Sequence, residues 1–172
     1  MLRMTIRSLR SNNHLRHFSL QTLKKSLGTA KGRVAVLPFP RMSPTMTSGK
    51  VTKWFVQPGQ YVKSYDLFLE IETSSLVQES SRVGIETIDI LEVEILEDMY
   101  VAKLCSPLEL SLNAGNLLAI LCDDPEDVAV LSALDFLPNE SIDLYDSCHS
   151  LQLALWQGYV KSNSGIQCTG CS

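Results

Sequence analysis

Two adjacent hydroxyl side chains, Ser74 and Ser75, stand near the end of the stretch LFLEIETSSL, residues 67–76. A serine at an exposed turn can act as a nucleophile when a general base activates it, or it can carry a covalently attached group. The sequence supplies no partner for the first role, since no Ser-His-Asp pattern, phosphate-binding loop or cluster of metal ligands accompanies these serines. We therefore expect no catalytic residue and no metal site, and we ask whether the stretch carries a group.

A second candidate is the C-x-x-C pair formed by Cys168 and Cys171. A zinc site would need two further ligands, and a redox pair would need a helix N-terminus in a thioredoxin-like setting. The sequence shows neither context. The chain has five cysteines, an odd number, and no evident disulfide framework. We therefore predict free thiols without a role at this pair.

Six carboxylates are predicted to lie near the end of the same hairpin. Paired carboxylates can do acid–base chemistry, but several of these alternate with apolar residues along predicted strands, and no pocket is implied. We therefore interpret them as a solvated acidic face. The six residues are Glu70, Glu72, Glu92, Glu94, Glu97 and Asp98.

Short β-rich runs separated by Pro and Gly turn signals must position these side chains. We predict strands over 34–37, 50–56, 67–72, 91–95, 100–105 and 116–122. No long amphipathic helix is predicted between residues 34 and 122, so the pattern indicates a small all-β sandwich or barrel. In the third strand the buried face is expected to hold Leu67, Leu69 and Ile71, and the outward face Phe68, Glu70 and Glu72.

The two ends of the chain differ from this β-rich part. Residues 1–30 are basic, rich in Ser and Leu and free of acids, which is typical of a mitochondrial transit peptide. We predict a disordered leader and linker over 1–33, with cleavage after Phe18 and a mature protein in the matrix; a disordered basic tail is the alternative. At the other end, 128–172 is predicted to be an extension with an amphipathic helix over 141–160.

The charge distribution excludes one class of partner. The first acidic residue is Asp66, and from there onward nineteen acids face only three basic residues, a balance of −16. Phosphate contacts need clustered Lys and Arg, so we expect no nucleic-acid partner. No apolar run reaches the 18 or so residues of a transmembrane helix, so none is predicted.

A resemblance to a known family rests on the phrase PRMSPTMTSGKVTKWFVQPGQYVKSYDLFLEIET, residues 40–73, and on EILEDMYVAKLC and NAGNLLAILCDDPED further along. These stretches resemble the lipoyl domain of mitochondrial 2-oxo-acid dehydrogenase acyltransferases, of the pyruvate dehydrogenase type, in the biotin/lipoyl attachment family. The resemblance implies a lipoyl-like domain over 34–127. Its expected fold is a flattened β-barrel of two four-stranded sheets, with a lipoyl group on the lysine of a Glu-Thr-Asp-Lys-Ala phrase at a hairpin tip.

The sequence departs from the family at that tip. Ser74 stands where the family has Asp, Ser75 where it has the lipoylated Lys, and Leu76 where it has Ala; no lysine occurs between Lys63 and Lys103. Lipoate attachment makes an amide and needs an amine, whereas a serine hydroxyl offers at best a labile ester. The resemblance therefore implies no cofactor and no cofactor-binding residue, with Ser75 as a degenerate lipoyl position.

Three further departures accompany the serine. About a dozen residues are inserted after the tip, over about 77–89, and Tyr65 and Met99 stand where the family has turn glycines. The phrase Ser-Ser-Leu is also loosely similar to the Asp-Ser-Leu of phosphopantetheine carriers. In those helical bundles the serine opens a helix, whereas here it follows a strand, so we regard the likeness as coincidence.

The functional hypothesis follows from these departures. Nothing in the chain resembles the acyltransferase domain or the subunit-binding domain of the family, so no enzyme activity is expected. We expect a non-catalytic, lipoyl-like accessory or adaptor protein that contacts subunits of a 2-oxo-acid dehydrogenase complex. Two alternatives stay open: a working acyl carrier of the pyruvate dehydrogenase complex that takes part in acetyl-CoA formation from pyruvate, and a truncated or spliced product without an independent role.

Overall fold

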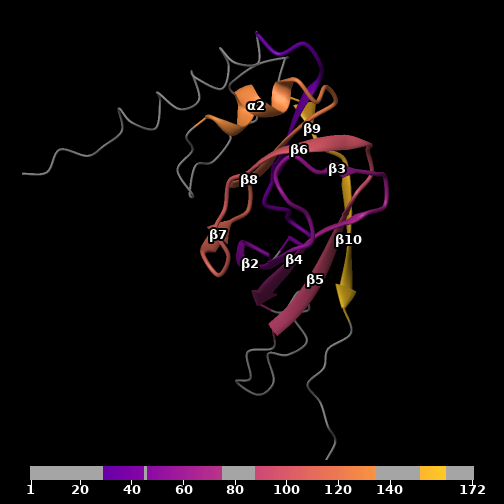
Figure 1. Cartoon of the computed structure of the whole chain (residues 1–172). Helices are drawn as coiled ribbons and strands as arrows, with labels where there is room; N and C mark the ends of the chain where they lie inside the picture. The colour runs from indigo at the N-terminus through magenta and orange to yellow at the C-terminus, as the bar shows by residue number, and fades with distance from the viewer. Residues whose placement is uncertain (1–28, 45, 75–87, 135–151, 162–172) are drawn as a thin grey trace, which may run out of the picture.

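The computed structural model describes residues 29–44, 46–74, 88–134 and 152–161, and their strands form two five-stranded sheets (Figure 1). Sheet A has the strand order β3-β6-β8-β1-β9, and sheet B has the order β10-β5-β4-β2-β7. The sheets face each other as a flattened, sandwich-like barrel, which confirms the all-β prediction. The strands are β1 (Val34–Pro38), β2 (Ser48–Trp54), β3 (Tyr61–Val62), β4 (Leu67–Ser74), β5 (Ile88–Ile95), β6 (Met99–Leu104), β7 (Ser111–Asn113), β8 (Leu117–Cys122), β9 (Gln152–Leu153) and β10 (Trp156–Lys161).

The main hydrophobic core lies between the two sheets. In β5 the alternation is strict: Leu91, Val93 and Ile95 are fully buried, while the side chains between them are partly exposed. Strands with one apolar face must turn that face toward the core, because a one-residue slip would move every apolar side chain into water. The predicted half-buried strand over 91–95 is therefore confirmed.

A second, smaller core lies on the outer face of sheet A. In β1, Ala35 and Leu37 point into the main core, whereas Val34 and Val36 belong to the outer cluster. The helix α2 (Asp127–Ser132) contributes Leu131 to that cluster. A strand that is apolar on both faces needs a cover on each, and α2 supplies one. The sequence predicts an extension from residue 128 with a helix only over 141–160, so α2 was not predicted.

One strand prediction is wrong in part. Leu69 and Ile71 are buried as expected, but Phe68 is fully buried and Leu67 is 37% exposed. The pairing of β4 with β5 shifts its register between Leu67 and Leu69, which marks a bulge. A bulge inserts one extra residue into the strand and so resets which side chains face inward. Phe68 uses its buried position to pack edge-on against Trp54, with ring centroids 5.8 Å apart.

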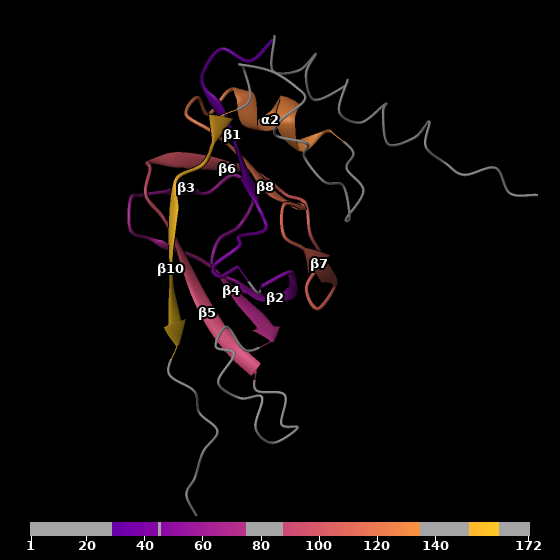
Figure 2. The same ribbon diagram turned by 180° about the vertical axis from the view of Figure 1, so that it is seen from behind.

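The predicted helix over 141–160 is wrong for residues 152–160, and residues 141–151 lie outside the described part of the chain. Residues 152–153 and 156–161 are β-strands (Figures 1 and 2). β9 pairs in parallel with β1, and β10 pairs antiparallel with β5. This C-terminal segment therefore adds one strand to the edge of each sheet, which explains why the sheets have five strands rather than the expected four.

The linker before β1 also differs from expectation. The sequence predicts a disordered leader and linker over 1–33, but Ala30 packs against the outer cluster of sheet A. The backbone N–H groups of Lys31 and Gly32 donate to the two carboxylate oxygens of Asp127, at 3.0 and 2.9 Å. Residues 1–28 are not among the described residues. Within the described part of the chain, no helix is long and apolar enough to cross a membrane.

Candidate functional site at the β4–β5 tip

The hairpin tip singled out in the sequence lies where β4 ends and β5 begins. Ser74 is the last residue of β4 and pairs with Ile88, the first residue of β5. Ser75 and Leu76 lie in the connection 75–87, outside the described residues. The inserted segment was predicted to extend to about residue 89. Ile88 and Asp89 belong to the β5 ladder, so the connection ends at residue 87.

The base of the tip is held by buried polar groups. Thr73 lies opposite Asp89, and the two side chains are only 3% and 4% exposed. The Thr73 hydroxyl donates to the backbone oxygen of Ser48 at 2.8 Å, so its buried donor is satisfied, as buried polar groups require. A Cβ at Gly49 would lie 2.5 Å from the backbone oxygen of Glu72. Glycine is therefore needed there for β2 and β4 to approach each other.

Two lysines flank this end of sheet B, and both form ion pairs. Lys50, opposite Glu72 in the β2–β4 ladder, is 3.1 Å from the Glu72 carboxylate and 2.8 Å from that of Glu109. Hydrogen bonds to Glu109 and then Glu72 raise the pKa of Lys50. Lys161 of β10 lies between Glu70 and Glu92, and hydrogen bonds to Glu92 and then Glu70 raise its pKa likewise. Both amines are therefore held as ammonium ions, which are not nucleophiles.

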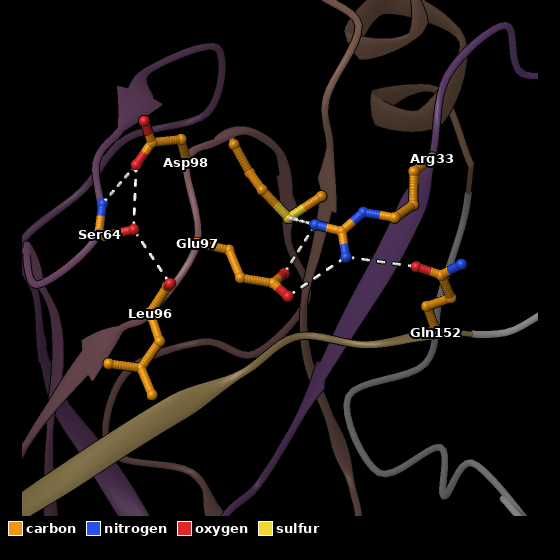
Figure 3. Close-up of polar contacts among 7 residues, drawn as sticks. Arg33, Ser64, Leu96, Glu97, Asp98 and Gln152 are labelled. Atoms are coloured by element: carbon orange, nitrogen blue, oxygen red, sulfur yellow. Dashed lines mark hydrogen bonds and ion pairs between the residues drawn. The ribbon is translucent and has the colours of Figure 1, made fainter.

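The predicted acidic cluster is divided between the β4–β5 ladder and the turn after β5. Glu70 and Glu92 face each other near the middle of the β4–β5 ladder. Hydrogen bonds from Thr52 and then Lys161 lower the pKa of Glu70. Glu97 and Asp98 instead lie in the turn after β5, at the end opposite the tip, so the expectation that they lie near the tip is wrong. Figure 3 shows that they bind structural partners there.

These contacts involve three other segments, two of them directly and the third through Arg33. Asp98 accepts hydrogen bonds from the backbone N–H of Ser64 at 2.8 Å and from its hydroxyl at 3.1 Å. Glu97 accepts from both terminal nitrogens of Arg33, at 3.2 and 2.8 Å, and Arg33 also donates to Gln152 at 3.3 Å (Figure 3). These carboxylates join the turn after β5 to the turn at Ser64 and to Arg33, just before β1, and nothing in their contacts resembles an acid–base pair.

The described residues beside the tip offer no lysine on a turn that could carry a lipoyl amide. The two lysines that flank the tip lie on regular strands, and both are ion-paired. Among the described residues, no group of three or more His, Cys, Asp or Glu side chains is arranged to hold a metal ion. Cys105 and Cys122 are buried and are not joined in a disulfide, and burial raises the pKa of Cys122 to about 11. Cys168 and Cys171 lie outside the described residues.

Part of the chain is similar to components of pyruvate dehydrogenase complexes. It is 34% identical over 94 residues to the dihydrolipoyllysine-residue acetyltransferase component from Rhizobium meliloti, and 35% identical over 96 residues to that from Zymomonas mobilis. It is 28% identical over 93 residues to the mitochondrial protein X component from Chaetomium thermophilum. These matches cover 54%, 55% and 54% of this chain but only 18%, 19% and 18% of those proteins. No family model matches the chain.

The chain thus spans less than a fifth of the length of the curated relatives that it matches. A plant relative, component 3 of the mitochondrial acetyltransferase from Arabidopsis thaliana, is 27% identical over 105 residues. The comparisons relate the chain to a short region of these proteins. Sequence reasoning anticipated that relation but missed the pairing of Lys161 with the acidic strands. The only signal was an isolated lysine in an acid-rich half of the chain.

Proposed function

We propose that this chain is a non-catalytic, lipoyl-like domain protein of the mitochondrial matrix. In this proposal it serves as an accessory or adaptor of a pyruvate dehydrogenase complex, or of another 2-oxo-acid dehydrogenase complex. Support comes from the similarity to the acetyltransferase and protein X components and from the barrel of two facing sheets. The transit-like composition of residues 1–30 supports the compartment.

One observation carries the non-carrier part of the proposal: no lysine occurs between Lys63 and Lys103, the stretch that contains the β4–β5 tip. A carrier needs a long, reactive arm on a turn, because its reach and the high effective concentration of a tethered group drive the reaction. Ser75 offers a short hydroxyl instead. The chain would then act through its surface rather than through a swinging arm.

Mass spectrometry of the intact protein purified from mitochondria tests this directly. We expect the mass of the unmodified mature chain, beginning near Ser19, and no signal with an antibody against lipoyl groups. An added mass equal to one lipoyl group would refute the proposal and favour the alternative of a working acyl carrier. A matrix form that begins at Met1 would refute the transit peptide.

Co-purification tests the adaptor role separately. A tagged copy expressed in mitochondria is expected to recover subunits of a dehydrogenase complex. A barrel-disrupting variant, Leu69→Asp, provides the control because Leu69 is fully buried in the main core. If the tagged protein is folded and abundant but recovers no such subunit, the alternative of a product without an independent role is favoured.

A further inference from the structure

The C-terminal strap, residues 152–161, occupies one edge of each sheet yet adds little to the core. Ala154 is buried and Trp156 packs partly against the main core. The strap's other large apolar side chains are between 44% and 57% exposed; they are Leu153, Leu155, Tyr159 and Val160. Among the described residues, all other members of the main core lie between residues 35 and 121. The two sheets therefore enclose their core almost without the strap.

The strap is held mainly by backbone pairing. Ala154 donates its N–H to the backbone oxygen of Val36 at 2.9 Å, and Leu155 accepts from the N–H of Leu96 at 3.0 Å. β10 then pairs with six successive residues of β5, from Ile95 to Ile90. An extended segment that adds to a sheet edge in this way is the geometry of peptide recognition by β-augmentation, in which main-chain bonds supply affinity and side-chain positions supply specificity.

The first position at which the edge of β5 selects a side chain is set by charge. Glu70 and Glu92 are directly opposite each other in the ladder, and both are well covered, with side-chain exposures of 17% and 26%. Like charges placed opposite each other on a sheet repel. Lys161 relieves this repulsion, since its ammonium lies 3.1 Å from Glu70 and 2.8 Å from Glu92. The edge of β5 thus requires a cation at the sixth position of β10.

Limited space makes Gly158 the second specific position, and a hydrogen bond of the residue before it adds to the specificity. Gly158 is opposite Val93, and a Cβ there would lie 2.4 Å from the terminal methyl of Met42. A branched side chain would have to shift the end of the Met42 side chain, which packs against the main core. Next to this glycine, the Gln157 amide donates to the Glu94 carboxylate at 2.7 Å. The edge therefore distinguishes side chains as well as backbone.

The other end of the strap is bound by a separate side chain, that of Arg33. Arg33 is fixed by its two bonds to Glu97 and extends a third to Gln152 (Figure 3). The edges of β1 and β5 thus form one continuous track, with a polar contact at its start, a small-residue position in the middle and a cation position at its end.

We propose that this track is a docking site for an extended peptide, and that the strap is an intramolecular ligand which a peptide of the same chemistry displaces. The partner would carry the strap's pattern: an aromatic residue, a glycine two residues later and a basic residue three residues after that. The strap belongs to the same chain as the edge that it occupies, and covalent connection of this kind raises the effective concentration of a ligand, to the order of millimolar with short flexible linkers. The tethered strap would therefore exclude peptides that bind weakly, and only peptides of high affinity would displace it. This inference is independent of the proposed function.

A nicked form of the full-length chain tests the proposal. A specific protease site is inserted between residues 135 and 151, and the protein is cut after folding. A fluorescein-labelled peptide of residues 150–164 is then added, and its anisotropy is measured. We expect saturable binding to the cut protein and no binding to the uncut protein at the same concentrations.

Matched peptides test the specificity. Lys161→Glu is expected to weaken binding about tenfold or more, because it sets a third carboxylate against Glu70 and Glu92. Gly158→Val is expected to weaken it because of Met42. Val160→Thr keeps the shape at a half-exposed site and should bind within about twofold of the parent peptide.

Three results would overturn the proposal. In the first, the cut protein loses its cooperative unfolding transition, which would make the strap an integral strand of the fold. In the second, the cut protein stays folded but never exchanges its own fragment for the labelled peptide. In the third, the Lys161→Glu and Gly158→Val peptides bind as well as the parent, so that the edge accepts any extended chain.

Discussion

At the scale of single residues, Tyr65 carries backbone strain. Its φ is +73°, in the left-handed region where side chains other than glycine cost about 1–2 kcal/mol. This position already stood out in the sequence, because the lipoyl domains that the chain resembles have a turn glycine there. The side chain is 68% exposed, so its removal sacrifices little packing.

We predict that Tyr65→Gly stabilises the protein by about 1 kcal/mol. The entropic cost of ordering glycine, which is more flexible in the unfolded chain, reduces this gain. Urea denaturation measures the change. The matched control is Gly59→Ala, since Gly59 has a φ of +83° with open space around it. That substitution should destabilise the protein. If both variants move in the same direction, backbone strain is not the cause.

Lys161 provides the residue-scale test of electrostatics in the strap. Its folded-state pKa is raised, so its contribution is complete below the unfolded pKa and is lost as pH rises through the folded value. The folded-state pKa of Glu70 is lowered, so its contribution is complete above its unfolded pKa and is lost as pH falls through the folded value. The network is therefore strongest between these limits, around neutral pH.

We predict that Lys161→Met destabilises the protein at pH 7, because two carboxylates then face each other without a cation. The pKa of Glu70 is lowered in the folded protein, so the difference from the unmodified protein should shrink as pH falls through that lowered value and the Glu70 carboxylate takes up a proton. Thermal unfolding at a series of pH values measures this. Adding Glu92→Gln to Lys161→Met should recover part of the loss at pH 7. A destabilisation that does not shrink as pH falls would assign the effect of Lys161→Met to packing.

At the scale of elements, strands were predictable where the pattern was local and failed where a partner decided the structure. The alternation of Leu91, Val93 and Ile95 needs only one buried face, and the structure confirms it. The bulge at Phe68 was not predictable, because it depends on the register of β4 against β5.

The segment 152–161 shows the same limit more strongly. Its apolar residues have a spacing that also fits a helix, but Leu153 and Leu155 are exposed and bury no helical face. The segment is a strand pair because the edges of β1 and β5 supply backbone partners. At the candidate site, the hairpin of β4 and β5 followed from the sequence, whereas the ion pairs of Lys50 and Lys161 required knowledge of which strands are neighbours.

The element α2 offers a test of how the segment before β1 is anchored. Asp127 is 4% exposed and accepts from the N–H groups of Lys31 and Gly32. We predict that Asp127→Ala destabilises the protein by about 1–3 kcal/mol, the cost of leaving buried donors unpaired. Asp127→Asn keeps one acceptor oxygen and should cost less. Urea denaturation measures both variants.

The neighbouring residue Glu126 serves as the control for that prediction. It forms an ion pair with Lys31 whose two side chains are 66% and 67% exposed, and such pairs contribute about 0–1 kcal/mol. Glu126→Ala should therefore change stability by much less than Asp127→Ala. Equal losses in the two variants would show that the charge at the start of α2 matters more than the buried hydrogen bonds.

At the scale of the whole molecule, the strap connects the two sheets at one pair of edges. Figures 1 and 2 show α2 at one end of the molecule and the ends of β4 and β5 at the other, with β10 running along β5 between them. The side chains of the strap contact the two sheets mostly through polar groups. Strand β8, in contrast, is buried along its whole length. Local opening starts where few apolar contacts must be broken, so the strap should open first.

We therefore predict that amide hydrogen exchange divides the molecule into two classes. Amides of β10 should exchange through local opening, at a rate on the order of tenfold or more above that of β8, whose amides require global unfolding. Lys161→Met should accelerate exchange in β10 and in its partner β5 while leaving β8 unchanged at pH 7, as long as the variant remains fully folded. Exchange followed by mass spectrometry resolves these segments. If β10 and β8 exchange together in both proteins, the strap and the barrel form one cooperative unit, and the strap opens only when the barrel unfolds.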